Sequence, residues 1–228
     1  MYNHSMIPQE AREEQTDAIR KKVRKLYRTL LYTTLGYLLG SLLPAKFFGN
    51  RISGKDVATE SPDHNPGVYN AFLYGGMLVG VLTLCFDLLK GFLPVFLYRS
   101  MPAGIPGAGL ALVLTAPVLG HIFPLWHRFR GGKGITVTFG CLLGLLPQRA
   151  PVLILAGVFL FFSLVLKVTP NCHRTLFTYL VSAALMYLLL PASPVPAGFC
   201  LITAAVAGKL LSGSEIREKC EVKLLWKH

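Results

Sequence analysis

The glycine-rich end of a basic segment is the part of the sequence best suited to bind an anion. It reads Gly131, Gly132, Lys133 and Gly134. Consecutive glycines let backbone N–H groups converge on one anion because no Cβ blocks the approach, and the lysine adds a positive charge. It is not a Walker A loop, because a glycine follows the lysine where Ser or Thr is required. The segment predicts a phosphate-binding loop; a turn facing lipid headgroups is the alternative.

A polar loop before the second apolar stretch holds another group of candidate side chains. Asp63, His64, Asn65 and Asn70 supply a carboxylate, an imidazole and two amides. Asn65 and Gly67 flank a proline, and this triplet is also a turn signal. If the first three membrane spans pack as a bundle, this loop and the glycine-rich loop emerge on the same face. The sequence then predicts one shared site.

Two ionisable residues lie inside an apolar stretch. Asp87 and Lys90 are three positions apart and therefore share one face of a helix, where their charges neutralise each other. Ionisable side chains at such positions are costly and are candidates for function. Two interpretations stay open: a purely structural pair, or a lysine that reaches an anionic ligand while the aspartate holds it in place.

The composition argues against a water-soluble globular enzyme. The 228 residues are 53% hydrophobic and only 15% charged, and the mean hydropathy is +0.51, whereas soluble domains are about 25% charged. The sequence predicts an all-α chain, a polytopic membrane helix bundle of six to seven transmembrane helices. The net charge of +12 favours membrane lipids or an anionic substrate as partners over nucleic acid.

Seven apolar stretches provide the spans. They are Leu30–Phe48, Ala71–Tyr98, Leu110–Trp126, Ile135–Leu146, Val152–Val168, Leu176–Leu190 and Val195–Leu211. The second exceeds one perpendicular crossing, which predicts tilt or a kink, and the fourth is short enough to be re-entrant. Small residues in the first stretch predict a close approach by another helix.

The chain divides into three parts by composition. Residues 1–28 form a basic polar extension, predicted to be a solvated helix on lipid headgroups; residues 29–211 form the transmembrane domain, and residues 212–228 a polar tail. No secretory signal peptide is expected at the start. The five cysteines show no pairing or metal-ligand spacing, so neither a disulfide framework nor a metal site is predicted.

The distribution of positive charge gives conflicting predictions of orientation. If all seven stretches cross, nine Lys and Arg lie on the side of the N-terminus and thirteen on the other. The larger number favours a cytoplasmic C-terminus, but the N-terminal cluster is the densest and favours the opposite. An in-plane opening helix or a fourth stretch that does not cross would relieve the conflict.

Four blocks of sequence resemble the polytopic bacterial acyl-phosphate:glycerol-3-phosphate acyltransferase family. They are Gly36-Tyr37-Leu38-Leu39-Gly40-Ser41 with Pro44, Asn65-Pro66-Gly67 with Asn70, Asp87-Leu88-Leu89-Lys90-Gly91, and Gly120-His121-Ile122-Phe123-Pro124 running to Gly131-Gly132-Lys133-Gly134. Each block alone is weak evidence. Their order and spacing between membrane spans make the resemblance specific over residues 35–146.

The resemblance implies a seven-helix bundle in the bacterial inner membrane with an active site that opens to the cytoplasm. It implies transfer of a fatty acyl group from acyl phosphate to glycerol 3-phosphate, which gives lysophosphatidate and phosphate, with no metal or coenzyme. The predicted catalytic residues are Asp63, His64, Asn65, Asn70 and Lys133. The predicted substrate-binding residues are Ser41, Gly67, Asp87, Lys90, His121, Gly131, Gly132, Gly134 and Lys209.

The sequence departs from the family pattern mainly in the acceptor half. The family loop reads Gly-Ser-Gly-Asn-Pro-Gly-Ala-Thr-Asn-x-x-Arg; here Asp63 and His64 replace the catalytic serine and its glycine, and Leu73 replaces an arginine that binds glycerol phosphate. A C-terminal His-x-x-Asn-x-x-Arg pattern aligns with Thr203, Val206 and Lys209.

These departures leave three interpretations. One is an acyltransferase with an altered acceptor, or with a base rebuilt from the histidine and its neighbouring carboxylate. Another is a non-catalytic homologue that binds lipid or acyl phosphate, or partners another membrane enzyme. A third, a small-solute transporter, would predict an internal repeat, and the sequence shows none.

Overall fold

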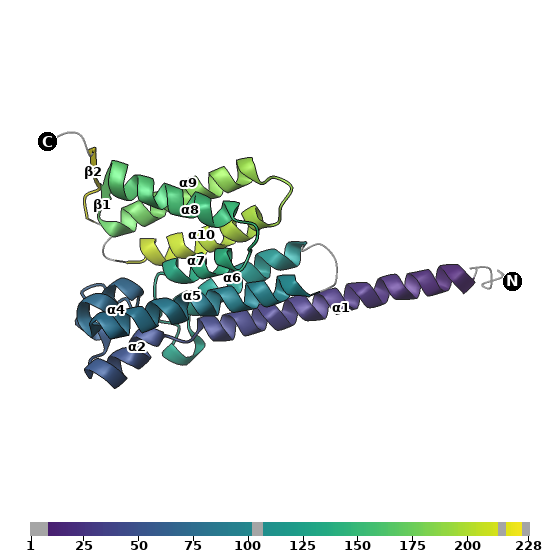
Figure 1. The fold of residues 1–228 in the computed structure, drawn as a ribbon, viewed down its shortest axis with the longest axis horizontal. Coiled ribbons are helices and arrows are strands. Elements are labelled where there is room, and N and C mark those ends of the chain that lie inside the picture. Colours follow the sequence, from purple (N-terminus) through teal and green to yellow (C-terminus); the bar gives the residue numbers. More distant parts are fainter. Residues whose placement is uncertain (1–8, 102–106, 214–217, 225–228) are drawn as a thin grey trace.

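The computed structural model describes residues 9–101, 107–213 and 218–224. Residues 1–8 of the predicted extension, residues 102–106, and residues 214–217 and 225–228 of the predicted tail lie outside this description. The described chain is mostly helical, and its longer helices run roughly alongside one another (Figure 1). The predicted helical class is therefore confirmed.

The first helix is longer than the sequence predicts. α1 (Gln9–Gly40) runs without a break through the boundary at residue 28 and projects beyond the bundle at the end opposite α2 (Pro44–Phe48) and α4 (Val68–Gly75) (Figure 1). The extension and the first span are therefore one continuous helix. The predicted helical extension is found over residues 9–28, and its position on lipid headgroups stays a prediction.

The first span ends earlier than predicted. Its helix stops at Gly40, and Leu42 and Leu43 link it to α2, instead of continuing to Phe48. Pro44 cannot extend a preceding helix because it lacks a backbone N–H. The chain then continues through a π-helical turn η1 (Gly49–Ser53) and α3 (Val57–Glu60) toward the polar loop.

The predicted kink in the long second stretch lies at Gly76. It separates α4 from α5 (Met77–Ser100), which carries Asp87 and Lys90. α6 (Ala108–Ile122) follows and packs against α1. A Cβ on Gly40 would collide with the backbone carbonyl of Pro117, so the small residue permits this close approach as predicted.

The remaining helices are short. After the 3₁₀ turn η2 (Leu125–His127), α7 (Ile135–Leu143) packs on α5, and α8 (Ala150–Leu160), α9 (Asn171–Leu189) and α10 (Val195–Leu211) form a second group that contacts α6 through α10. The short fourth element is confirmed. The seventh predicted stretch matches α10 at both ends.

The fifth predicted stretch is wrong beyond residue 165. A π-helical turn η3 (Phe161–Val165) follows α8, and β1 (Leu166–Thr169) then pairs antiparallel with β2 (Glu221–Leu224), with Leu166 opposite Leu224. Both segments alternate apolar and polar residues and include β-branched side chains, which favour strands. This two-stranded sheet adds to the predicted all-helical class.

Apolar side chains lie both inside and outside the bundle. A core of fully buried residues such as Leu114, Ile122, Tyr179 and Phe199 connects the two helix groups. Many large apolar side chains on α5, α8 and α9 are nevertheless exposed. Two segments, Met77–Ser100 and Ala108–His127, are long and apolar enough to cross a membrane, and two shorter ones are apolar.

Candidate active site

The predicted site residues meet at one end of the bundle. A cavity of about 320 Å³ is lined by Asn65 and Gly67 before α4, Asp87 of α5, His121 of α6, and the glycine-rich loop. From this loop come Lys133 and Gly134. Three of the four sequence blocks therefore line one cavity, and the expected meeting of the two loops is confirmed.

Lys90 is the centre of a buried hydrogen-bond network. Its ammonium lies 2.8 Å from the Asp87 carboxylate, 2.8 Å from His121 Nδ1 and 2.6 Å from the carbonyl oxygen of Leu42. An ammonium has three N–H donors, so all three have a partner. Lys90 does not line the 320 Å³ cavity. This arrangement favours a positioning role over the predicted direct contact with substrate.

This network sets the tautomer of His121. An ammonium can only donate, so Nδ1 of the ring accepts its hydrogen bond and the proton of the neutral ring is on Nε2. A Cβ on Gly132 would overlap Nε2 and lie 3.1 Å from Asn65 Oδ1. The glycine therefore lets the loop approach the ring closely, and an N–H donor is placed between both loops.

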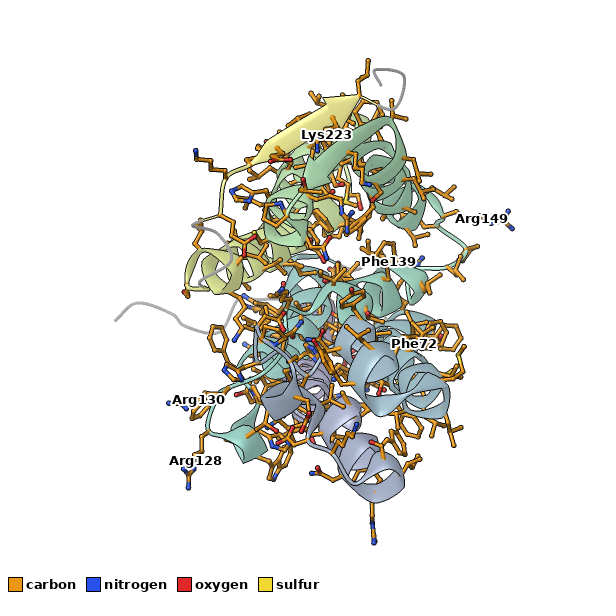
Figure 2. The ribbon with its side chains drawn as sticks, turned by 90° about the vertical axis from the view of Figure 1, so that its left-hand side faces the viewer. Phe72, Arg128, Arg130, Phe139, Arg149 and Lys223 are labelled. Atoms are coloured by element: carbon orange, nitrogen blue, oxygen red, sulfur yellow. The ribbon has the colours of Figure 1, made fainter. Side chains whose placement is uncertain are left out.

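The glycine pair does not form the predicted backbone cradle. The N–H of Gly131 donates to the carbonyl of Ile122, and the N–H of Gly132 donates to the carbonyl of His121. Both groups thus satisfy carbonyls at the C-terminal end of α6, which a helix end leaves without intrahelical partners. What the glycines provide is close approach. Arg128 and Arg130, in the same loop, point away from the bundle (Figure 2).

Asp63 connects the two loops through its carboxylate. Oδ2 lies 3.0 Å from the Lys133 ammonium, and Oδ1 accepts a 2.7 Å hydrogen bond from the Asn70 amide. The same amide also donates to the carbonyl of Asn65. Burial raises the pKa of Asp63, but the hydrogen bond and charge of Lys133, with smaller contributions from Asn70 and Asn65, lower it below the ordinary 3.8. A carboxyl with this pKa is a weak base and a stable anchor for the lysine.

Replacing Asp63 with asparagine is expected to lower thermal stability by an amount that depends on pH. The folded-state pKa lies below the ordinary value, so the stabilisation is present above about pH 4 and is lost as the pH falls through the lower folded-state value. Thermal melts of both proteins from pH 3 to 8 measure the difference. It should be constant from pH 5 to 8 and shrink below pH 4; a difference that grows on acidification would contradict the ion pair.

His64 is exposed and has a backbone φ of 49°. Its Nδ1 lies 3.1 Å from the carbonyl oxygen of Ala58. Because a carbonyl only accepts, Nδ1 carries the proton of the neutral ring, and Nε2 has the basic lone pair. The neighbouring Asp63 carboxylate bonds to Lys133 and Asn70, and the imidazole bonds to the Ala58 carbonyl instead of to this carboxylate.

A second cavity, of about 380 Å³, adjoins the first and shares Asn65 and Lys133 with it. Asp63, Asn70 and Leu73 also line it. Its far wall is the beginning of α9, with Asn171, Arg174 and Thr175. The sequence analysis did not predict that α9 lines the site. The signal that could have shown it was a basic residue just after Pro170 and before an apolar stretch.

Lys209 and Ser41 lie in different surroundings. Lys209, at the end of α10, lines a cavity of about 130 Å³ together with Asp63, His64 and Lys133, so the structure brings it to the site. Ser41 is fully buried; its hydroxyl donates to the Tyr37 carbonyl and accepts from the Leu125 N–H. The serine therefore ties η2 to α1, and the cavity it lines is a separate apolar one.

Within the described ranges, no three His, Cys, Asp or Glu side chains gather in a way that could hold a metal ion. The reaction without metal or coenzyme implied by the resemblance stays a prediction.

The arrangement of these blocks agrees with a comparison of the whole sequence. A model of the glycerol-3-phosphate acyltransferase family matches residues 30–219. The chain belongs to this family. The match includes the polar loop, α5, the glycine-rich loop and α10, and it begins just after the N-terminal extension.

Curated relatives in the glycerol-3-phosphate acyltransferase family match over a shorter range. The protein of Actinobacillus pleuropneumoniae serotype 5b (strain L20) is 42% identical over 115 residues, which cover 50% of this chain and 57% of the relative. That of Pseudomonas syringae pv. syringae (strain B728a) is 40% identical over 126 residues, which cover 55% and 64%. The chain thus matches little more than half the length of these relatives.

Two crystal structures of PlsY (YgiH), described as an integral membrane glycerol 3-phosphate acyltransferase, share the fold. The glycerol 3-phosphate form superimposes with a TM-score of 0.68 at 24% identity and covers 79% of this chain and 87% of that one. The lysophosphatidic acid form gives a TM-score of 0.62 at 25% identity with the same coverage. This likeness shows the fold, and together with the apolar helices of the chain it supports a membrane protein.

Proposed function

We propose that the chain transfers a fatty acyl group from acyl phosphate to glycerol 3-phosphate or a related acceptor. The observation that carries this proposal is the 320 Å³ cavity, in which Asn65, Asp87, His121 and Lys133 meet. Family membership and the names of the relatives support the same reaction.

The cavity holds the donors that such a transfer needs. The acceptor hydroxyl oxygen forms a bond to the acyl carbon, and the bond from that carbon to the phosphate oxygen breaks, so phosphate leaves with the electron pair. The proton of the hydroxyl goes to a base, for which Nε2 of His64 is the candidate; His64 lines the 130 Å³ cavity, which shares Asn65 and Lys133 with the 320 Å³ cavity. Lys133 neutralises charge on the leaving phosphate, and the Nε2–H of His121 is suited to stabilise the developing oxyanion.

In the same proposal the chain crosses the bacterial inner membrane six or seven times. The site faces the cytoplasm. The end of the bundle with α2, α4 and the glycine-rich loop carries most of the basic loop residues, which supports a cytoplasmic position for that end. The N-terminal end of α1 would then project from the opposite side.

A non-catalytic homologue that binds lipid or acyl phosphate is the second candidate. The position of Asp63 favours it, because this residue replaces the family serine and its carboxylate already pairs with Lys133 at 3.0 Å. A donor phosphate would have to compete with this carboxylate for the lysine.

Incubation of the purified protein with palmitoyl phosphate and a panel of acceptors, glycerol 3-phosphate first, distinguishes the candidates. Formation of lysophosphatidate and phosphate in equal amounts supports the transferase. Binding of palmitoyl phosphate without an acylated product from any acceptor favours the non-catalytic homologue.

His64→Ala is expected to abolish transfer but to leave binding of palmitoyl phosphate unchanged. The base is required only when the hydroxyl attacks, and loss of a general base typically costs about 10²- to 10⁴-fold in rate. Turnover and donor affinity measured on the same preparation check this. His173→Ala, which changes an imidazole that lines none of the three polar cavities, is the matched control. Full transfer activity in the His64 variant would exclude it as the base.

A further inference from the structure

The 380 Å³ cavity has an unusual balance of charge. Three charged residues line it. Two of them, Asp63 and Lys133, pair with each other at 3.0 Å. Arg174 is the other charged residue that lines it. Within the described residues no carboxylate forms an ion pair with this guanidinium. Arg174 therefore supplies the surplus positive charge of the cavity.

The guanidinium is held in place but only partly used. One terminal nitrogen donates to the side-chain oxygen of Asn171, and the group lies 5.8 Å from the centre of the Phe159 ring. Nε is buried and has no hydrogen-bond partner in the part of the chain that the structure describes. Buried donors are seldom left without partners, so a purely structural role for Arg174 leaves this nitrogen unexplained.

Leu73, on α4, lines the same cavity. In the family pattern this position is an arginine, and the sequence here replaces it with an apolar side chain that is 58% exposed. The cavity thus lacks the family guanidinium on α4 but has a guanidinium on α9. Guanidinium groups bind phosphate through two parallel hydrogen bonds.

From this placement we propose that Arg174 binds the phosphate group of a phosphorylated acceptor in the 380 Å³ cavity. The inference rests on the proposed function, which supplies the acceptor. It adds a binding residue on α9 and names the acceptor class as small phosphate monoesters of polyols. The cavity shares Lys133 and Asn65 with its neighbour. An acceptor held by Arg174 would therefore lie beside a donor held at the 320 Å³ cavity.

Equilibrium binding of labelled glycerol 3-phosphate to the purified full chain tests the proposal without requiring turnover. Arg174→Ala is expected to raise the Kd by about 10- to 100-fold, and Arg174→Lys to raise it less. Adding Leu73→Arg to Arg174→Ala should recover most of the affinity, because a guanidinium then reaches the cavity from α4. Glycerol, which lacks the phosphate, should bind equally weakly to all variants.

Arg149→Ala is the matched control, since Arg149 is exposed and points away from the bundle (Figure 2). Thermal melts identify any variant that fails to fold, and the lysine and Leu73→Arg variants keep the test possible in that case. An unchanged Kd in folded Arg174→Ala, or no binding of glycerol 3-phosphate by the wild-type chain, would overturn the proposal. Arg174-dependent binding without transfer to any acceptor would refute the proposed function alone.

Discussion

Lys133→Ala is expected to abolish consumption of palmitoyl phosphate, with a loss of at least about 100-fold in kcat/KM. Lys133 is the one ionisable residue of the glycine-rich loop that lines all three adjoining polar cavities. Removing a preorganised group that stabilises transition-state charge typically costs about 10²- to 10³-fold. Release of phosphate from palmitoyl phosphate, followed over time with saturating acceptor, measures the effect.

The matched control for this variant is Arg130→Ala. Arg130 lies in the same loop but points away from the bundle (Figure 2), so its loss removes the same charge without changing the cavities. Lys133→Arg keeps a positive charge and should retain part of the activity. Wild-type turnover in Lys133→Ala would remove the lysine from the phosphate-binding role. Equal losses in Lys133→Ala and Arg130→Ala would indicate a general effect of surface charge instead.

The positions of the site residues were largely predictable because membrane helices and loops restrict them. Asn65 precedes the second apolar stretch and Lys133 follows the third, so two crossings separate the loops and packing as a bundle places both at the same end. Apolar content and length also predicted the span that became α10 and the short α7. These features depend on local sequence and on the thickness of a bilayer.

The partners of the side chains were not predictable from the same patterns. The glycine pair predicted a cradle for an anion, but the N–H groups of Gly131 and Gly132 bond to α6 carbonyls, which depends on where that helix ends in space. Likewise, the sequence spacing indicated the pair of Asp87 and Lys90 but not the third partner, His121. Contacts between elements distant in sequence decided both outcomes.

The place of Arg174 beside the site could not be predicted from a local sequence pattern either. This residue lies 101 residues after Leu73 in the numbering, and no local pattern connects the two positions. Only the tertiary fold brings residues of α4, α9 and the glycine-rich loop to one cavity. When a motif lacks a charged side chain, the other elements that line the same cavity therefore need to be searched for one.

Lys90→Met is expected to destabilise the folded protein by about 3–5 kcal/mol, because it leaves the Asp87 carboxylate buried without its counter-charge. It also removes the donor to His121 Nδ1 and the Leu42 carbonyl. The double variant Asp87→Leu, Lys90→Met removes the isolated charge and should recover much of the thermal stability. Thermal melts and turnover with palmitoyl phosphate, measured on all three proteins, give the two readouts.

The two readouts separate a structural pair from a positioning residue. If Lys90 serves only to neutralise Asp87, the double variant should recover activity together with stability. If it also fixes the Nε2–H tautomer of His121, stability recovers while kcat stays low, since the ring is then free to turn its unprotonated nitrogen toward the cavity. The hydrogen bonds of Lys90 to His121 and Leu42, beside its ion pair with Asp87, favour the second result. Wild-type kcat in the double variant would limit Lys90 to the structural role.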